Sequence, residues 1–281
     1  QPGHVYVVAT PIGNIGDISA RALEVLSTAD VIIAEDTRRT SSLLQHLNLP
    51  MCKHMFSHHS HNTEKSLTRI RALLKSKNSI ALVSDAGTPG ISDPGQGLVA
   101  MCGGMGTPVH AVPGASACIS ALSVSGFGGS EFLFKGFLPI KGKSRADSIS
   151  SIQAYTETVV LYEAPHRVLS TMNDLATGVR GAENRRCVCC RELTKLHEEV
   201  YRGSVTEYIS LQISTEKLRG EFVIVLGPLD SLLYNAEVLC NRDLCLLRDD
   251  GVARSDAVRI VTESSSLPRS KVYRLALSIE W

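Results

Sequence analysis

Charged side chains follow apolar, strand-like runs at several places in this 281-residue chain. The segment EDTRRT contains Asp36 and Arg38, SDAGTPGISDPG contains Asp85, and LYEAPHR contains Glu163 and Arg167. A fourth segment, RELTKLHEE, carries Arg191, Glu192 and Lys195. Side chains of these types can bind a polar ligand or move a proton on it. A set of solvated surface ion pairs is the alternative for each segment.

The elements that must position these residues are apolar runs, each followed by a turn and then by apolar residues at helical spacing. In the first half they cover residues 5–9, 31–34, 80–83 and 109–112. Alternating strands and helices predict a mostly parallel sheet, with ligands at the carboxyl ends of its strands. In the segment SDAGTPGISDPG, Asp85 is predicted to face a ligand, whereas Asp93 followed by Pro94 is also typical of a helix start.

The composition changes near residues 126–145, which are rich in glycine and contain four basic residues. Beyond them, strands are expected at 158–162 and 186–190 and a helix at 165–177. From about residue 240 the pattern is helical. We therefore predict two α/β domains, 1–127 and 128–232, with a cleft between them where the charged segments meet, and a small helical extension at 233–281.

Composition excludes several classes of protein. The 29 Lys and Arg nearly balance the 28 Asp and Glu, so any contact with RNA must come from a local patch. No run approaches the roughly 20 apolar residues of a membrane span. The eight cysteines are interpreted as buried thiols. The segments FSHHSHN and CVCC lack the partner spacing of a zinc site, so no metal is expected. Dinucleotide, P-loop, serine-elbow and zincin motifs are absent.

Eight segments in order resemble one known family: VATPIGNIGDISARALEVL, AEDTRRT, ALVSDAGTPGISDPG, VPGASA, GFLP, YEAPHR, RELTKLHEE and GEFVIVL. They are similar to the bacterial-type small-subunit ribosomal RNA cytidine-2′-O-methyltransferases of the tetrapyrrole methylase superfamily. The resemblance extends from residue 5 to about residue 277. It implies a two-domain α/β fold, S-adenosylmethionine in the cleft, a homodimer, and methylation of a ribose 2′-hydroxyl in the small ribosomal subunit.

The resemblance also suggests roles for particular residues. A ribose hydroxyl is a weak acid, so a base or a cation that stabilises the alkoxide should help its methylation. The catalytic candidates are Glu192, Lys195, Glu163 and Asp36. The cofactor candidates are Pro11, Ile12, Gly13, Asp85, Ala86, Gly87, Thr88, Gly114, Ala115, Ser116, Ala117, Tyr162, Gly220, Glu221 and Phe222. The candidates for RNA contact are Arg38, His59, His61, Asn62, Lys141, Lys143, Arg167 and Arg191.

Departures from the family pattern and alternatives remain. HEHN of the family reads His59-Ser60-His61-Asn62 here, DTRHT reads DTRRT, and GTPL reads GTPG. The loss of a carboxylate at Ser60 argues against a base at that position. A porphyrin or corrin ring methyltransferase, or a non-catalytic interaction protein with the same fold, are the alternative functions. The expected location is the cytoplasm if the protein is bacterial, and a plastid or mitochondrion if it is organellar. In the organellar case a targeting segment ahead of Gln1 would lie outside this sequence.

Overall fold

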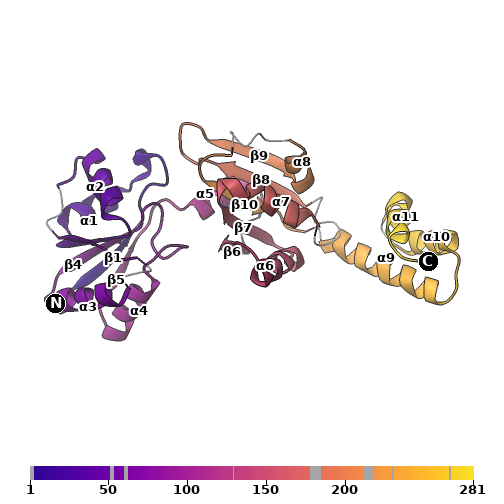
Figure 1. Cartoon of the computed structure of the whole chain (residues 1–281), viewed down its shortest axis with the longest axis horizontal. Coiled ribbons are helices and arrows are strands. Elements are labelled where there is room, and N and C mark those ends of the chain that lie inside the picture. The colour runs from indigo at the N-terminus through magenta and orange to yellow at the C-terminus, as the bar shows by residue number, and fades with distance from the viewer. Residues whose placement is uncertain are drawn as a thin grey trace.

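The computed structural model describes residues 3–50, 54–59, 63–128, 130–177, 185–211, 218–229, 231–265 and 267–281. Two α/β units and a group of helices follow one another along the chain (Figure 1). This arrangement agrees with the predicted fold class. The domain bounds at residues 127 and 232 stay a prediction, because the helix that ends just before the first of them packs on the second sheet, as described below.

The first unit is a parallel sheet with helices on both faces. Its strand order is β3-β2-β4-β1-β5, and each neighbouring pair is parallel. The strands are β1 (His4–Val8), β2 (Val31–Ala34), β3 (Met55–Ser57), β4 (Ser79–Val83) and β5 (Val109–Val112). The predicted parallel sheet is confirmed, and four of its strands fall on the four apolar runs.

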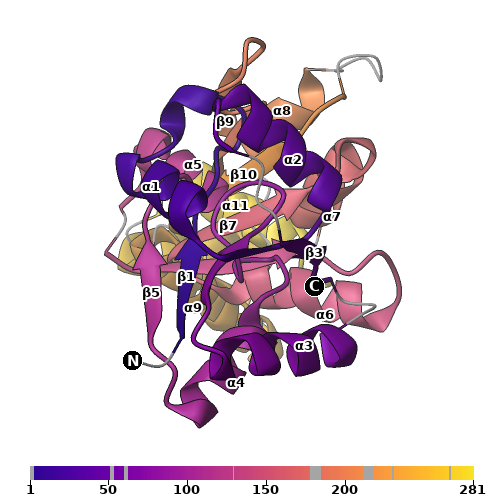
Figure 2. The same ribbon diagram turned by 90° about the vertical axis from the view of Figure 1, so that its left-hand side faces the viewer.

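Four helices enclose this sheet: α1 (Ala20–Thr28), α2 (Thr37–His46), α3 (Thr63–Lys75) and α4 (Gln96–Met105). Helices α1 and α2 pack on one face through Leu26 and Leu44, and α3 and α4 pack on the other through Ile70 and Leu98. Figure 2 shows the two pairs on opposite sides of the strands. All four side chains are 2% exposed or less, so both faces of the sheet are dry core.

The second unit is a mixed sheet of order β6-β7-β10-β8-β9. Only β6 and β7 are parallel, and the other neighbouring pairs are antiparallel. The strands are β6 (Phe132–Phe137), β7 (Thr158–Glu163), β8 (Arg186–Arg191), β9 (Glu199–Ser204) and β10 (Phe222–Leu226). The predicted helix at 165–177 begins as a 3₁₀ turn, Pro165–Arg167, and continues as α7 (Val168–Thr177).

The faces of the second sheet have different covers. Helices α6 (Lys143–Ala154), α7 and α8 (Val205–Ser210) cover one face, which includes Cys187 and Cys189. The other face, with Cys190, packs against α5 (Ala117–Ser125) and against Ile12 from the loop after β1. The cysteines therefore alternate between faces as their strand spacing predicts. Burial raises the pKa of the Cys189 thiol to about 12, as expected for an inert core residue.

The C-terminal helices form a group with its own hydrophobic core. They are α9 (Ser231–Asp249), α10 (Arg254–Ser264) and α11 (Arg269–Leu277). Their core includes Leu244, Val258, Val261 and Val272, each 2% exposed or less. Figure 1 shows this group beyond the second sheet, at the opposite end of the molecule from the first sheet. Within the described residues, none of the helices is both long and apolar enough to cross a membrane.

Candidate active site

A cavity of about 390 Å³ lies between the two sheets, at the carboxyl ends of β2 and β4. Its volume is within the usual range for small-molecule sites. Its walls come from both units, because residues 12–117 supply one side and residues 137–223 the other. The cavity-lining residues of the predicted cofactor set are Ile12, Asp85, Ala86, Gly87, Thr88, Ser116, Ala117, Tyr162, Gly220, Glu221 and Phe222.

The loop after β4 reaches the cavity because its backbone is paired with the loop after β1. Gly87 and Thr10 exchange two backbone hydrogen bonds, of 3.0 and 2.9 Å. Gly87 has φ +79°, a conformation that other L-residues adopt only with strain. The Thr88 hydroxyl then donates a hydrogen bond of 3.1 Å to the Ala115 carbonyl. The turn that opens α5 is thereby fixed to the same wall.

Four predicted cofactor residues do not line the cavity: Pro11, Gly13, Gly114 and Ala115. Gly13 lies against the side chain of Lys195 with no room for a Cβ, and the Asn14 amide donates to the Thr194 hydroxyl at 3.1 Å. The close approach of the two units explains the glycine at position 13. Gly114 likewise packs against Ala9.

Acidic groups dominate the first-unit wall. Glu35, Asp85 and Asp93 all line the cavity, and Arg39 is the cation among them, with its Nε 3.4 Å from an Asp85 carboxylate oxygen. Burial, and then the nearby charge of Glu35, raise the pKa of Asp93 to about 6. Such a pocket favours a ligand that carries positive charge or hydrogen-bond donors.

Aromatic rings form the opposite wall. The Tyr162 hydroxyl accepts a hydrogen bond from the Cys118 amide at 3.0 Å, and burial raises the pKa of Tyr162 to about 12. Phe137 lies edge-on to the Tyr162 ring, with centroids 5.6 Å apart. Phe137 also lines the cavity and is 57% exposed, so its ring is free to contact a ligand.

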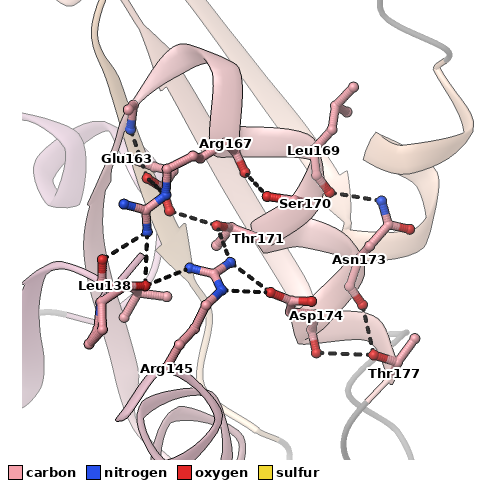
Figure 3. Close-up of polar contacts among 12 residues, drawn as sticks. Leu138, Arg145, Glu163, Arg167, Leu169, Ser170, Thr171, Asn173, Asp174 and Thr177 are labelled. Atoms are coloured by element: carbon pink, nitrogen blue, oxygen red, sulfur yellow. Dashed lines mark hydrogen bonds and ion pairs between the residues drawn. The ribbon is translucent and has the colours of Figure 1, made fainter. Parts of the chain in front are cut away.

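Glu163 also lines the cavity, at the base of this wall. Its side chain is 0% exposed, and its carboxylate accepts hydrogen bonds from the Ala164 amide at 2.8 Å and the Thr171 hydroxyl at 2.6 Å. Arg167 completes the set with its Nε 3.3 Å from the same carboxylate (Figure 3). The geometry therefore gives Glu163 a structural environment, and its catalytic role stays a prediction that these contacts disfavour.

Arg167 and Arg145 hold the segment that follows β6. Arg167 donates to the Leu138 carbonyl at 2.8 Å, and Arg145 donates to the Pro139 carbonyl at 3.1 Å while it pairs with Asp174 at 2.6 Å (Figure 3). Both arginine side chains are at most 15% exposed. Arg167 is thus engaged inside the protein and has little surface left for the RNA phosphate that was predicted for it.

Glu192 and Lys195 form an ion pair of 2.8 Å beside the cavity. Lys195 also contacts the Glu221 carboxylate at 2.9 Å, and the Glu221 amide donates to Glu192 at 2.9 Å. Burial works against both charges, yet these hydrogen bonds leave the pKa of Glu192 lowered and that of Lys195 raised. This ion pair holds the 192–195 loop in place, and it makes Glu192 a poor proton acceptor.

The remaining predicted residues lie at the surface or outside the described part. Asp36 caps α2 and binds Arg38, whose hydrogen bonds lower the pKa of Asp36 to about 2. Arg38, Lys141 and Lys143 are exposed. Arg191 is occupied by Glu199 and the Arg219 carbonyl. His59 is described, whereas His61 and Asn62 lie outside the described residues.

Sequence reasoning missed several residues of the cavity. Glu35 and Arg39 line the cavity, whereas the predicted residues Asp36 and Arg38, each one position away in the sequence, do not. Of the two interpretations left open for Asp93, the helix start is not the one observed, because α4 begins at Gln96 with Gly95 as its N-cap. Among the described residues, no group of three or more His, Cys, Asp or Glu is placed to hold a metal ion.

Comparisons with known proteins agree with this geometry. Residues 4–209 match the family model of the Tetrapyrrole (Corrin/Porphyrin) Methylases. A uroporphyrin-III C-methyltransferase from Thermus thermophilus, solved with S-adenosyl homocysteine, superposes with a TM-score of 0.55 at 15% identity, covering 80% of this chain and 97% of its own. This likeness shows the fold alone. The fold and the family match define the class as a two-domain methylase of the tetrapyrrole type.

Relatives with higher sequence identity identify the family within this class. A Synechocystis protein named ribosomal RNA small subunit methyltransferase I is 43% identical over 281 residues, 99% of each chain. A Thermotoga maritima protein of the same name is 44% identical over 225 residues, which cover 80% of this chain and 98% of the relative. The chain belongs to the ribosomal RNA small subunit methyltransferase I family of tetrapyrrole methylases.

Proposed function

We propose that this protein transfers the methyl group of S-adenosylmethionine to the ribose 2′-hydroxyl of a cytidine in small-subunit ribosomal RNA. The observation that carries the proposal is the near-complete match to a relative named for this RNA, together with an interdomain cavity of suitable size. The ring methyltransferase is the second candidate, favoured only by the family name and the distant structural likeness.

The cavity fits the proposed cofactor. It is large enough for a nucleoside-sized ligand, and its acidic wall of Glu35, Asp85 and Asp93 suits a cation. Asp85 and the backbone of residues 86–88 would hold the cofactor on one side, and Tyr162 with residues 220–222 on the other. When bound, the cofactor supplies an activated methyl group on a positively charged sulfur.

The protein residues then supply position and proton transfer. The substrate ribose would enter between the two walls beside Phe137, and a well-oriented hydroxyl can gain about 7 kcal/mol from alignment alone. Arg38, Lys141 and Lys143 are exposed and suit phosphate contacts that fix the position of the RNA without reading bases. Arg191 is a weaker candidate, because it already binds Glu199, and the role of His59 stays a prediction.

The test is methyl transfer from labelled S-adenosylmethionine to unmodified small ribosomal subunits, with a precorrin-type ring as the competing acceptor. We expect label in the RNA, at a single cytidine ribose found by 2′-O-methyl mapping, and none in the ring. Transfer to the ring alone would contradict the proposal. Mapping the RNA of a strain that lacks the protein identifies the compartment, which stays a prediction, as does the homodimer.

A further inference from the structure

Asp93 reaches the cavity through an unusual stretch of backbone. Ser92 before it has φ +63° and Gly95 after it has φ +133°, both outside the range that most residues prefer. A Cβ at Gly95 would meet Leu82 at 3.0 Å. The turn therefore brings the Asp93 side chain toward the interdomain wall instead of into the first turn of α4. Asp93 lines the cavity together with Tyr162 and Phe137.

The charged and titratable groups around Asp93 come from each element that surrounds it. Glu35 follows β2, Asp85 follows β4, and both add negative charge, while Tyr162 on β7 faces it from the second unit. Arg39 of α2 is bound to Asp85. Within the described part of the chain, no Lys, Arg or His forms an ion pair with Asp93, although Ser84 donates a hydrogen bond to it.

The other carboxylates proposed as bases lack this freedom. Glu163 is held by Arg167 and two hydrogen bonds, Glu192 is paired with Lys195, and Asp36 is paired with Arg38. A carboxylate paired with a cation is a weaker base than one in a partly dry site without a cation. Burial and the charges of Glu35 and Asp85 raise the pKa of Asp93 to about 6, closer to neutral pH.

We propose that Asp93 is the catalytic base, which accepts the proton of the 2′-hydroxyl as that oxygen takes the methyl group. The new bond joins the ribose oxygen to the methyl carbon, the carbon–sulfur bond breaks, and its electron pair stays on sulfur, which becomes a neutral thioether. The hydroxyl proton passes to the Asp93 carboxylate and then to solvent. This inference rests on the proposed function and names a residue for it.

The experiment measures single-turnover methyl transfer to small subunits between pH 5 and 9, at saturating cofactor, for the full-length protein and for Asp93→Asn. Without the substitution, the rate should rise with pH through a midpoint at the pKa of Asp93, about 6, and level off above about pH 7. The positive cofactor beside Asp93 would move that midpoint down. Asp93→Asn should be slower by roughly 10²–10⁴-fold and should lose the pH-dependent rise. Its cofactor Kd, measured by calorimetry, should rise by no more than about tenfold, because Glu35 and Asp85 keep the wall acidic, so weaker binding cannot account for the loss of rate at saturating cofactor.

Two further variants make the result specific. Asp147→Asn makes the same chemical change on the exposed surface of α6 and should leave the rate unchanged. Asp93→Glu keeps a carboxylate and should restore part of the rate together with the pH-dependent rise, which covers the case in which the asparagine variant does not fold.

Three results would overturn the assignment: an asparagine variant within a few-fold of the normal rate, a pH-dependent rise that survives the substitution, or a loss of cofactor affinity that accounts for the whole defect. Absence of methyl transfer by the unsubstituted protein at every pH would instead reject the proposed function.

Discussion

Arg167 illustrates how a charged residue after a strand can serve the fold. Its guanidinium binds the Glu163 carboxylate, whose side chain is 0% exposed, and two carbonyls of the segment after β6. Removal of the arginine would leave a buried carboxylate without its counter-charge. The position of residues 138 and 139, which directly follow Phe137, therefore depends on this side chain.

We expect Arg167→Ala to lower the free energy of unfolding by about 3–5 kcal/mol, because it leaves one partner of a buried ion pair unpaired. Urea unfolding followed by circular dichroism measures this. The matched control is Arg38→Ala, whose side chain is 89% exposed and which should leave the free energy of unfolding nearly unchanged. A normal unfolding curve for Arg167→Ala, with weakened RNA binding, would restore the phosphate role predicted from sequence.

At the residue level, the sequence predicted which segments form the site better than which atoms face it. Asp85, Tyr162 and Glu163 line the cavity, as predicted, but the Glu163 carboxylate is bound by Arg167, which does not line it. That difference depends on Thr171 and on the carbonyls of residues 138 and 139, contacts distant in sequence. Side-chain direction of this kind has no local sequence signal.

Among the elements, the second sheet is tied together at one end by Arg185. This residue lies just before β8, is 5% exposed, and donates to the carbonyls of Gly227, Ile152 and Glu157 at 2.7, 3.0 and 2.6 Å. The three acceptors belong to the ends of β10 and α6 and the start of β7. Burial lowers the pKa of Arg185 to about 10, so it stays charged at neutral pH.

We expect Arg185→Ala to lower the free energy of unfolding by about 3 kcal/mol or more. Hydrogen bonds to a charged group contribute about 1.5–3 kcal/mol each, and three carbonyls, two of them buried, lose their donor. The neighbouring Arg186→Ala is the control, because Arg186 is exposed on β8 and its loss should be nearly neutral. Thermal and urea unfolding both report the difference. Equal effects of the two substitutions would contradict the structural role of Arg185.

Some of the helices and strands could be predicted from the sequence, and others could not. The apolar runs of β1, β2, β4 and β5 are each followed by a turn and then by residues at helical spacing. This alternation of strand and helix made the parallel sheet predictable. Strand β6 was not, because its residues are only partly buried and are interrupted by Gly136, where the pairing with β7 shifts. The antiparallel order of the second sheet depends on long-range pairing that no local pattern records.

At the scale of the whole molecule, the C-terminal helices are separate from the site. Every described residue that lines the cavity lies between positions 12 and 223, and the family model ends at residue 209. The hydrophobic core of α9, α10 and α11 is built from residues 240–281. A Thermotoga relative matches over 98% of its own length and covers only 80% of this chain.

We therefore expect a chain that ends at Leu229 to fold and to bind S-adenosylmethionine with a Kd within about threefold of the full-length value, a change of less than about 1 kcal/mol. Calorimetry measures the affinity, and circular dichroism reports the sheets. The control is Val261→Asp in the full chain, which places a charge in the core of the helical group while it leaves that group covalently attached. Both proteins should bind the cofactor alike. If the shortened chain loses the cofactor but Val261→Asp retains it, then α9 supports the second sheet directly. If both lose it, the helical group is part of the same cooperative unit as the cavity.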